Sequence, residues 1–312
     1  MKSTYTMRSM ARIGIALLAL VTTLFAGSSL FAQSPDIQTL PFGSNTSWGE
    51  LAGFGDGAIQ TFVTADSSGK PEYVGLYFTA GLLSGLPETP SDGHWDVVDA
   101  SGNVIIPCCG HEVVLYFPDT AVAIPFKHAV INWNPFGHPP ADVYDKPHFD
   151  MHFYTITNDE RTAIATATAD TMCFVPNPPG APAGEHPVPV TCDTLAQAAL
   201  PLPEGQLPPG YIDVAEIAPG MGNHLVNMAA HELMGTEQFT HTWIYGAFGG
   251  RLTFYEPMIT NAFLEERNPE TCAAISMPEE MPEPGYYPSQ YCIRYLSDQD
   301  AFAVTLESFV AY

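Results

Sequence analysis

The chain has 312 residues, of which 46% are hydrophobic and 12% aromatic, as in folded proteins and unlike disordered acidic tails. It carries 34 acidic and 10 basic residues, a net charge of −24 at pH 7. Such a surface repels nucleic acid and anionic membranes, so we exclude both as partners, and it attracts cations, including metal ions.

The first 32 residues are typical of a signal peptide. Lys2, Arg8 and Arg12 precede the apolar run 13–25, and small residues lead to a cleavage position after Ala32. Removing these 32 of 312 residues leaves 280, with seven basic and 34 acidic residues and a net charge of −27. An uncleaved anchor is the alternative, but the run is short for a membrane span. We therefore expect export to the periplasm or beyond, with no membrane association of the mature form.

Six cysteines, at 108, 109, 173, 192, 272 and 292, suit an exported protein, in which disulfides are permitted. Cys173 with Cys192, and Cys272 with Cys292, would close loops of similar size. The adjacent Cys108 and Cys109 could form a vicinal disulfide, pair elsewhere or bind metal with His111, and we favour a structural disulfide. Six cysteines allow 15 pairings, so the sequence leaves the connectivity open.

Short strand-like segments follow an irregular lead-in over 33–56. They alternate with Gly, Asn and Pro at a spacing that predicts a mainly β fold, an antiparallel sandwich or barrel-like sheet. The expected strands in this half are 59–64, 73–79, 94–98, 104–106, 113–117 and 128–133.

The second half adds one or two short helices and a long Pro-rich loop to the same domain, 57–312. Caps and composition favour a helix over 158–171, and a second is possible over 225–234. The Pro-rich stretch, about 175–209, is expected to be an ordered loop pinned by Cys173 and Cys192. The segments 239–258 and 290–306 are expected to form hairpins. A two-residue turn at Gly249-Gly250 would place Trp243 opposite Glu256, with His241 on the same face and diagonal to Glu256.

The segment 148–153 has the most informative pattern, His-Phe-Asp-Met-His-Phe. Alternate side chains of a strand point to opposite faces. His148, Asp150 and His152 would therefore share one face, and Phe149, Met151 and Phe153 the other. Imidazoles and carboxylates are metal ligands and acid–base groups, so this strand is predicted to be one wall of a divalent-metal or acid–base site.

Other segments must complete such a site. His138, before two prolines, and His224, after Gly220-Met-Gly222, are the candidate further metal ligands beside His148 and His152. Asp150 and Glu256 are candidate catalytic groups. Asp150 could instead ligate the ion or orient a histidine, and Glu256 could simply hydrogen-bond an aromatic neighbour. In the alternative interpretation, His148 and His152 are ordinary polar residues of a half-exposed strand.

The resulting hypothesis is an exported protein with a mononuclear site for a divalent metal, zinc in preference to copper, built on His148 and His152. If catalytic, it would be a metal-dependent hydrolase or lyase using a metal-activated water. The alternatives are a non-catalytic envelope or stress-response protein that binds a small molecule or protein partner or forms a homo-oligomer, and a pH-sensitive histidine cluster. His231-Glu232 lacks the second histidine of a metalloprotease helix, because position 235 is Gly.

Four segments together resemble a known family: 138–140 (His-Pro-Pro), 144–154 (Tyr-Asp-Lys-Pro-His-Phe-Asp-Met-His-Phe-Tyr), 221–224 (Met-Gly-Asn-His) and 254–260 (Phe-Tyr-Glu-Pro-Met-Ile-Thr). The family is a group of exported bacterial proteins of unknown function, whose prototype is controlled by an extracytoplasmic-stress sigma factor. The resemblance covers about residue 70 to the C-terminus and supports the choice of His138, His148, His152, His224 and Glu256. It implies no particular reaction.

Overall fold

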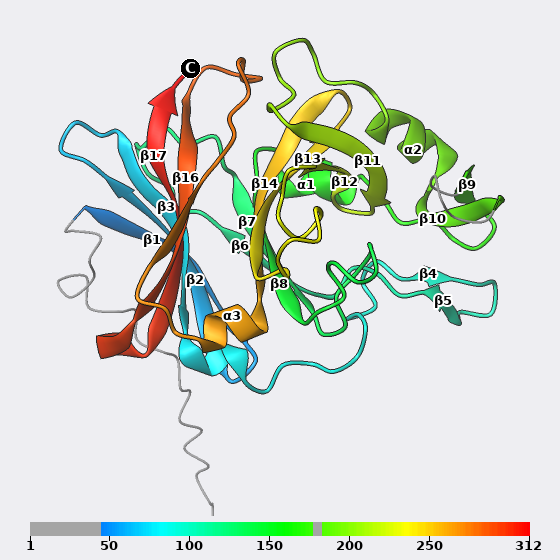
Figure 1. The fold of residues 1–312 in the computed structure, drawn as a ribbon, viewed down its shortest axis with the longest axis horizontal. Helices are drawn as coiled ribbons and strands as arrows, with labels where there is room; N and C mark the ends of the chain where they lie inside the picture. The colour runs from blue at the N-terminus through cyan, green and yellow to red at the C-terminus, as the bar shows by residue number, and fades with distance from the viewer. Residues whose placement is uncertain (1–44, 177–182) are drawn as a thin grey trace, which may run out of the picture. The chain divides into compact units, whose positions relative to one another are not determined.

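Two antiparallel sheets dominate the structure, which is a computed structural model and describes residues 45–176 and 183–312 (Figure 1). One sheet has six strands, in the order β1-β2-β3-β17-β16-β15, and the other has seven, in the order β11-β12-β13-β14-β8-β7-β6. The predicted mainly β, sandwich-like fold is confirmed. The expected signal peptide, 1–32, lies outside the described residues.

The strands of the six-stranded sheet are β1 (Thr46–Phe54), β2 (Gly57–Ala65), β3 (Pro71–Thr79), β15 (Thr271–Ala274), β16 (Tyr286–Leu296) and β17 (Ala301–Ala311). Those of the seven-stranded sheet are β6 (His111–Tyr116), β7 (His128–Asn134), β8 (His148–Tyr154), β11 (Tyr211–Ala218), β12 (Gly222–Asn227), β13 (His241–Phe248) and β14 (Arg251–Thr260). Two small hairpins are β4 (Val97–Val98) with β5 (Val104–Ile106), and β9 (Met172–Pro176) with β10 (Glu185–Thr191). The helices are α1 (Asn158–Thr162), α2 (Cys192–Ala198) and α3 (Asn261–Glu265), with 3-10 turns at Ala80–Leu83 and Ser297–Gln299.

The main hydrophobic core lies between the two sheets. Phe149, Met151 and Phe153 of β8 belong to one buried cluster with Leu76 of β3 and Val304 of β17. One face of each sheet is apolar in this way because successive side chains of a strand alternate. The predicted apolar face of the 148–153 strand is therefore confirmed as the core face.

The other face of the seven-stranded sheet is also buried, although it carries many polar side chains. Among its buried members are His128, Asn132, Asn134, His148, Asp150, His152 and Glu256. Connecting segments cover it: Tyr144 and Phe239 pack against Ile244 and Met258 of the sheet. The fold thus has a second, partly polar interior layer behind the seven-stranded sheet.

Two expectations for the first half need correction. The lead-in, 33–56, is not irregular throughout, because Thr46–Phe54 forms β1 and pairs with β2. The helix expected over 158–171 ends at Thr162. Beyond it, the amides of Ala167 and Ala169 donate to carbonyls of distant residues, so tertiary hydrogen bonds replace helical ones.

Two further expectations fail in the second half. The Pro-rich stretch, about 175–209, is not simply a loop, since β10, α2 and the end of β9 lie in it, and its part 177–182 lies outside the described residues. No helix forms over 225–234. Its start belongs to β12, which pairs with β11 and β13, and turns follow. Strand pairing supplied by the sheet outweighs the local helix preference.

All six cysteines form disulfides: Cys108–Cys109, Cys173–Cys192 and Cys272–Cys292. The two long-range pairs are those expected from loop size, and the vicinal disulfide excludes the metal-binding alternative for Cys108 and Cys109. Three disulfides indicate a non-cytoplasmic environment. In the part of the chain that the structure describes, no helix is long and apolar enough to cross a bilayer.

Candidate metal centre

Strand β8 brings three of the candidate side chains to the buried polar face. His148 and His152 have no exposed surface, and Asp150 is 4% exposed. Their row follows from the two-residue period of the strand, as the sequence predicted. On this face each histidine is joined by a carboxylate and by a histidine from another segment, which gives two triads.

The first triad comprises His138, His148 and Asp150, whose ligand atoms lie within 4.8 Å of one another. His148 Nε2 is 3.0 Å from Asp150 Oδ1, and His138 Nε2 is 3.6 Å from Asp150 Oδ2. His138 comes from the segment between β7 and β8 and keeps 35% of its side chain exposed. The triad is thus closed by the sheet on one side and open at His138.

The second triad comprises His152, His224 and Glu256, again with ligand atoms within 4.8 Å of one another. His152 Nε2 lies 3.6 Å from Glu256 Oε2. His224, on β12, is partly exposed, whereas the other two are buried. The Phe254 ring packs edge-on against both histidines, with its centroid 4.8 Å from that of His152 and 5.4 Å from that of His224.

Glu256 reaches this face because the β13–β14 hairpin contains a bulge. The two-residue turn at Gly249-Gly250 forms as expected, but the register shifts at Gly246/Ala247. Glu256 therefore pairs with Ile244, and Trp243 pairs with Pro257. The expected Trp243–Glu256 pairing is wrong, because a shift of one residue exchanges the faces of every side chain beyond it.

The four histidines of the triads share one orientation. In each, the ring Nδ1 lies near a backbone carbonyl oxygen. The distance is 2.6 Å from His148 to Lys146 and 2.8 Å from His138 to Pro139. It is 3.4 Å from His152 to Val130 and 2.8 Å from His224 to Glu216. A carbonyl oxygen can only accept, so Nδ1 carries the proton in each ring. In the neutral form of each ring, Nε2 therefore keeps its lone pair available to a cation, as in histidines that bind metal.

Several of these atoms are buried without a hydrogen-bond partner among the described residues. They include His148 Nε2, Asp150 Oδ1, His152 Nε2 and Glu256 Oε2. Unpaired buried acceptors are costly and uncommon. His148 Nε2 and Asp150 Oδ1 face each other at 3.0 Å, and His152 Nε2 and Glu256 Oε2 at 3.6 Å, so a proton or a cation can lie between each pair.

The charge state of the first triad is set by its own members. Burial favours the neutral form of Asp150, but the imidazoles of His148 and His138 outweigh burial and hold its pKa well below the usual value. Burial likewise lowers the pKa of His138, but its contact with Asp150 prevails and raises that pKa. Asn134 Nδ2 donates to Asp150 Oδ2 at 2.7 Å and fixes the carboxylate.

In the second triad, burial decides the direction of every pKa shift. Burial, followed by the charge of Asp150, raises the pKa of Glu256 well above its usual value. Burial lowers the pKa of His152 to about 3 and also lowers the pKa of His224. Without a cation, His152 is therefore neutral at neutral pH, and burial favours the uncharged forms of His224 and Glu256.

All six candidate residues named from the sequence lie in one triad or the other. His148 and His152, expected to share one ion, belong to different groups. His241, expected near Glu256, instead lies 2.8 Å from the Tyr291 hydroxyl. Asn134 belongs to the site although the sequence pattern did not single it out; it ends a strand on which Asn132 and Asn134 alternate with apolar residues.

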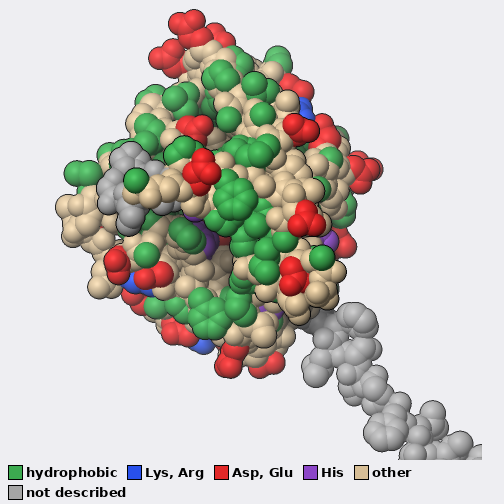
Figure 2. Space-filling view, turned by 90° about the vertical axis from the view of Figure 1, so that its right-hand side faces the viewer, with side chains coloured by type: hydrophobic (Ala, Val, Ile, Leu, Met, Phe, Trp, Pro, Cys, Tyr) green, Lys and Arg blue, Asp and Glu red, His purple; other side chains and the backbone are tan. Residues whose placement is uncertain are grey.

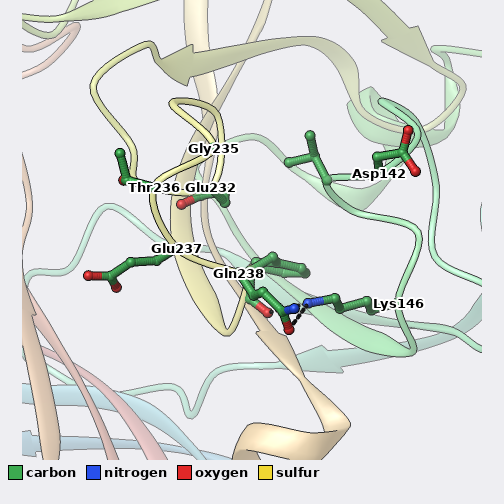
Figure 3. A pocket seen from close by; sticks show the side chains of 9 residues that line it. Asp142, Lys146, Glu232, Gly235, Thr236, Glu237 and Gln238 are labelled. Carbon is green, nitrogen blue, oxygen red and sulfur yellow. Dashed lines mark hydrogen bonds between the residues drawn. The ribbon is translucent and has the colours of Figure 1, made fainter.

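Figure 2 shows histidine at the bottom of a hollow on the surface. A separate pocket of about 340 Å³ is lined by residues around Lys146 and by 235–239 (Figure 3). It contains no triad ligand but adjoins the triad, because the Phe239 ring lies 5.4 Å from that of His148.

Comparison of the chain with known protein families, with curated proteins and with solved structures found no match in any of the three.

Proposed function

We propose that this is an exported metal-binding protein whose two triads each hold a divalent cation, zinc in preference to copper. The observation that carries the proposal is the common orientation of the four histidines. Nε2 of His138, His148 and His152 lies 3.0–3.6 Å from a carboxylate oxygen, and Nδ1 of all four histidines is fixed by a carbonyl. Two imidazoles and one carboxylate form a donor set that zinc accepts.

Export is supported by two independent features. The N-terminal 32 residues have the composition of a signal peptide. The three disulfides belong to an oxidising compartment. Together they support the proposal that the protein is exported to the periplasm or beyond.

Three protein ligands leave one position of a tetrahedral zinc open, which is the arrangement of catalytic rather than structural zinc. A water there would have its pKa lowered to about 7, as zinc hydrolases and lyases require. We assign Asp150 and Glu256 to ligation, since each faces a histidine Nε2. The general-base role considered for them from the sequence stays a prediction.

Elemental analysis of purified protein grown with added zinc tests the proposal. We expect the parent chain to retain zinc, and the His148→Ala/His152→Ala variant, which removes one ligand from each triad, to lose it. His231→Ala is the matched control, because His231 is exposed and lies outside both triads. A folded parent protein free of zinc and other divalent metals would disprove the proposal.

A further inference from the structure

A second surface pocket is lined by two methionines and a histidine. It has a volume of about 530 Å³, and Met228, His231 and Met234 are among its lining residues. None of the six triad residues lines it. His231 is exposed, and Met228 and Met234 are 46% and 63% exposed. A single exposed apolar side chain is ordinary, but two thioethers beside an imidazole in one pocket form a cluster that packing does not explain.

The backbone places His231 and Met234 together. The amide of Met234 donates to the carbonyl of Ala230 at 3.0 Å, which closes one helical turn after β12. His231 and Met234 are three residues apart in this turn and therefore lie on one side of it. Leu233 packs instead against the buried cluster that includes Phe239. The turn is thus held on the protein by Leu233 and presents its polar and thioether side chains to the pocket.

Met228 precedes this turn. Its amide donates to the carbonyl of Gly210 at 3.2 Å, and Gly210 lines the same pocket. A methionine side chain has three rotatable bonds, so an exposed thioether can turn toward an ion without disturbing the core. The two sulfurs therefore approach the imidazole from either end of the segment 228–234.

The hydroxyl of Thr236 determines which nitrogen of His231 is free. Thr236 Oγ1 donates to the His231 carbonyl oxygen at 3.2 Å and lies 3.1 Å from His231 Nδ1. Because a hydroxyl has one proton to donate, it accepts from Nδ1, which carries the proton of the neutral ring. Nε2 of the neutral ring keeps its lone pair for a metal ion, with Nδ1 held by a partner as in metal-binding histidines.

The donor set shows which ion fits. Two thioether sulfurs and one imidazole nitrogen are soft and uncharged ligands. Thioethers select Cu(I), whereas zinc takes imidazole, thiolate and carboxylate. Uncharged donors also leave the charge of the ion uncompensated, which costs less for a monovalent ion than for a divalent one. This preference is the opposite of that of the two triads, whose carboxylates suit a divalent cation.

We propose that Met228, His231 and Met234 form a surface site for Cu(I). The site goes beyond the proposed function and does not depend on it, because the ligands, the pocket and the preferred ion all differ. The strongly acidic surface of the protein attracts cations to it. Since all three ligands are exposed, the bound ion remains accessible to exchange.

Competition with a chromogenic Cu(I) chelator tests the proposal. The full mature chain is loaded with zinc, and Cu(I) kept reduced by ascorbate is then added in the absence of oxygen. We expect one Cu(I) per chain, sulfur ligands in its X-ray absorption spectrum and an unchanged zinc content. The His148→Ala/His152→Ala variant should bind Cu(I) as tightly as the parent, so a failure of the triads to hold zinc does not obscure the result.

Variants of the three ligands supply the decisive comparison. Met228→Leu and Met234→Leu remove the sulfur at nearly constant volume, so both should fold. Each should bind Cu(I) about tenfold or more weakly than the parent with its zinc retained, and so should His231→Ala. Met172→Leu is the matched control, because Met172 is a half-buried methionine outside the pocket.

Three outcomes would overturn the Cu(I) site while leaving zinc binding intact. They are a folded parent that binds no Cu(I), a Cu(I) spectrum without sulfur ligands, and equal affinity in the ligand variants and in Met172→Leu. Loss of Cu(I) binding in the His148→Ala/His152→Ala variant would overturn the independence of the site from the triads.

Discussion

At the scale of single residues, the site depends on side chains that orient the ligands. Each triad histidine is held by a carbonyl, and Asp150 is held by the amide of Asn134. Such partners fix the direction of the lone pair before a cation arrives, which reduces the ordering that binding must impose. A residue that touches no cation can therefore control affinity.

Asn134→Ala tests this role. Removing the amide frees the Asp150 carboxylate to rotate, so zinc affinity of the first triad should fall about 10–100-fold. Competition with a chromogenic chelator measures the affinity. Asn132→Ala is the matched control, since Asn132 lies on the same strand and face but donates to the Cys109 carbonyl. Equal losses in the two variants would show that Asn134 has no specific positioning role.

At the scale of elements, the bulge in the β13–β14 hairpin builds the second triad. It brings Glu256 to the face that carries His152, and the Phe254 ring lies against Gly246. A Cβ at Gly246 would lie 1.9 Å from that ring. Close packing therefore requires glycine at this position. Backbone conformation does not, since φ of Gly246 is not positive.

Gly246→Ala should consequently displace Phe254, which packs against His152 and His224. We expect a loss of about 1–3 kcal/mol in the free energy of unfolding and a fall in bound zinc from two ions to one, with the first triad retained. Denaturant titration and elemental analysis measure the two effects. Gly53→Ala, where a Cβ meets only ordinary contacts, should change neither. Retention of two zinc ions in Gly246→Ala would refute the link between bulge and site.

At the scale of the whole molecule, the ion pair between Arg161 and Glu112 links helix α1 to the seven-stranded sheet. Arg161 of α1, 1% exposed, donates to both carboxylate oxygens of Glu112 on β6, at 2.9 and 2.8 Å. Trp95 also donates to Glu112. The pair connects the sheet edge, α1 and the segment before β4, which are distant in sequence.

This pair predicts a loss of stability in acid. Burial raises the pKa of Glu112, but Arg161 outweighs burial and lowers it below the ordinary value of 4.5. Because the folded-state pKa is the lower one, the stabilisation is complete above about pH 4.5 and is lost as the pH falls through the folded-state pKa. Glu112→Gln should cost about 3–5 kcal/mol at neutral pH, because it leaves Arg161 buried without its counter-charge.

Urea unfolding of the parent and of Glu112→Gln between pH 7 and pH 3 checks this. The difference between them should shrink toward the acid end. Glu270→Gln, which removes a largely exposed partner of Arg294, should cost less than about 1 kcal/mol. A difference that is constant over the whole pH range would contradict the assignment to the Glu112 carboxylate.

The sequence by itself determined the faces of the central strand, whereas it left the pairing of the six cysteines open. A strand's two-residue period places His148, Asp150 and His152 together whatever surrounds them. It also predicted the hairpins over 239–258 and 290–306, since turn residues act locally, and it named all six residues of the two triads.

Only the tertiary structure decided how those residues are grouped. The division into two triads depends on the Gly246/Ala247 bulge and on the path of the segment that carries His138, and neither has a local pattern that fixes it. The strand at Gly222–Asn227 forms where a helix was expected, because neighbouring strands supply its hydrogen bonds. Burial of the polar face was likewise undetermined by the sequence, since covering it requires contacts between segments far apart in the chain.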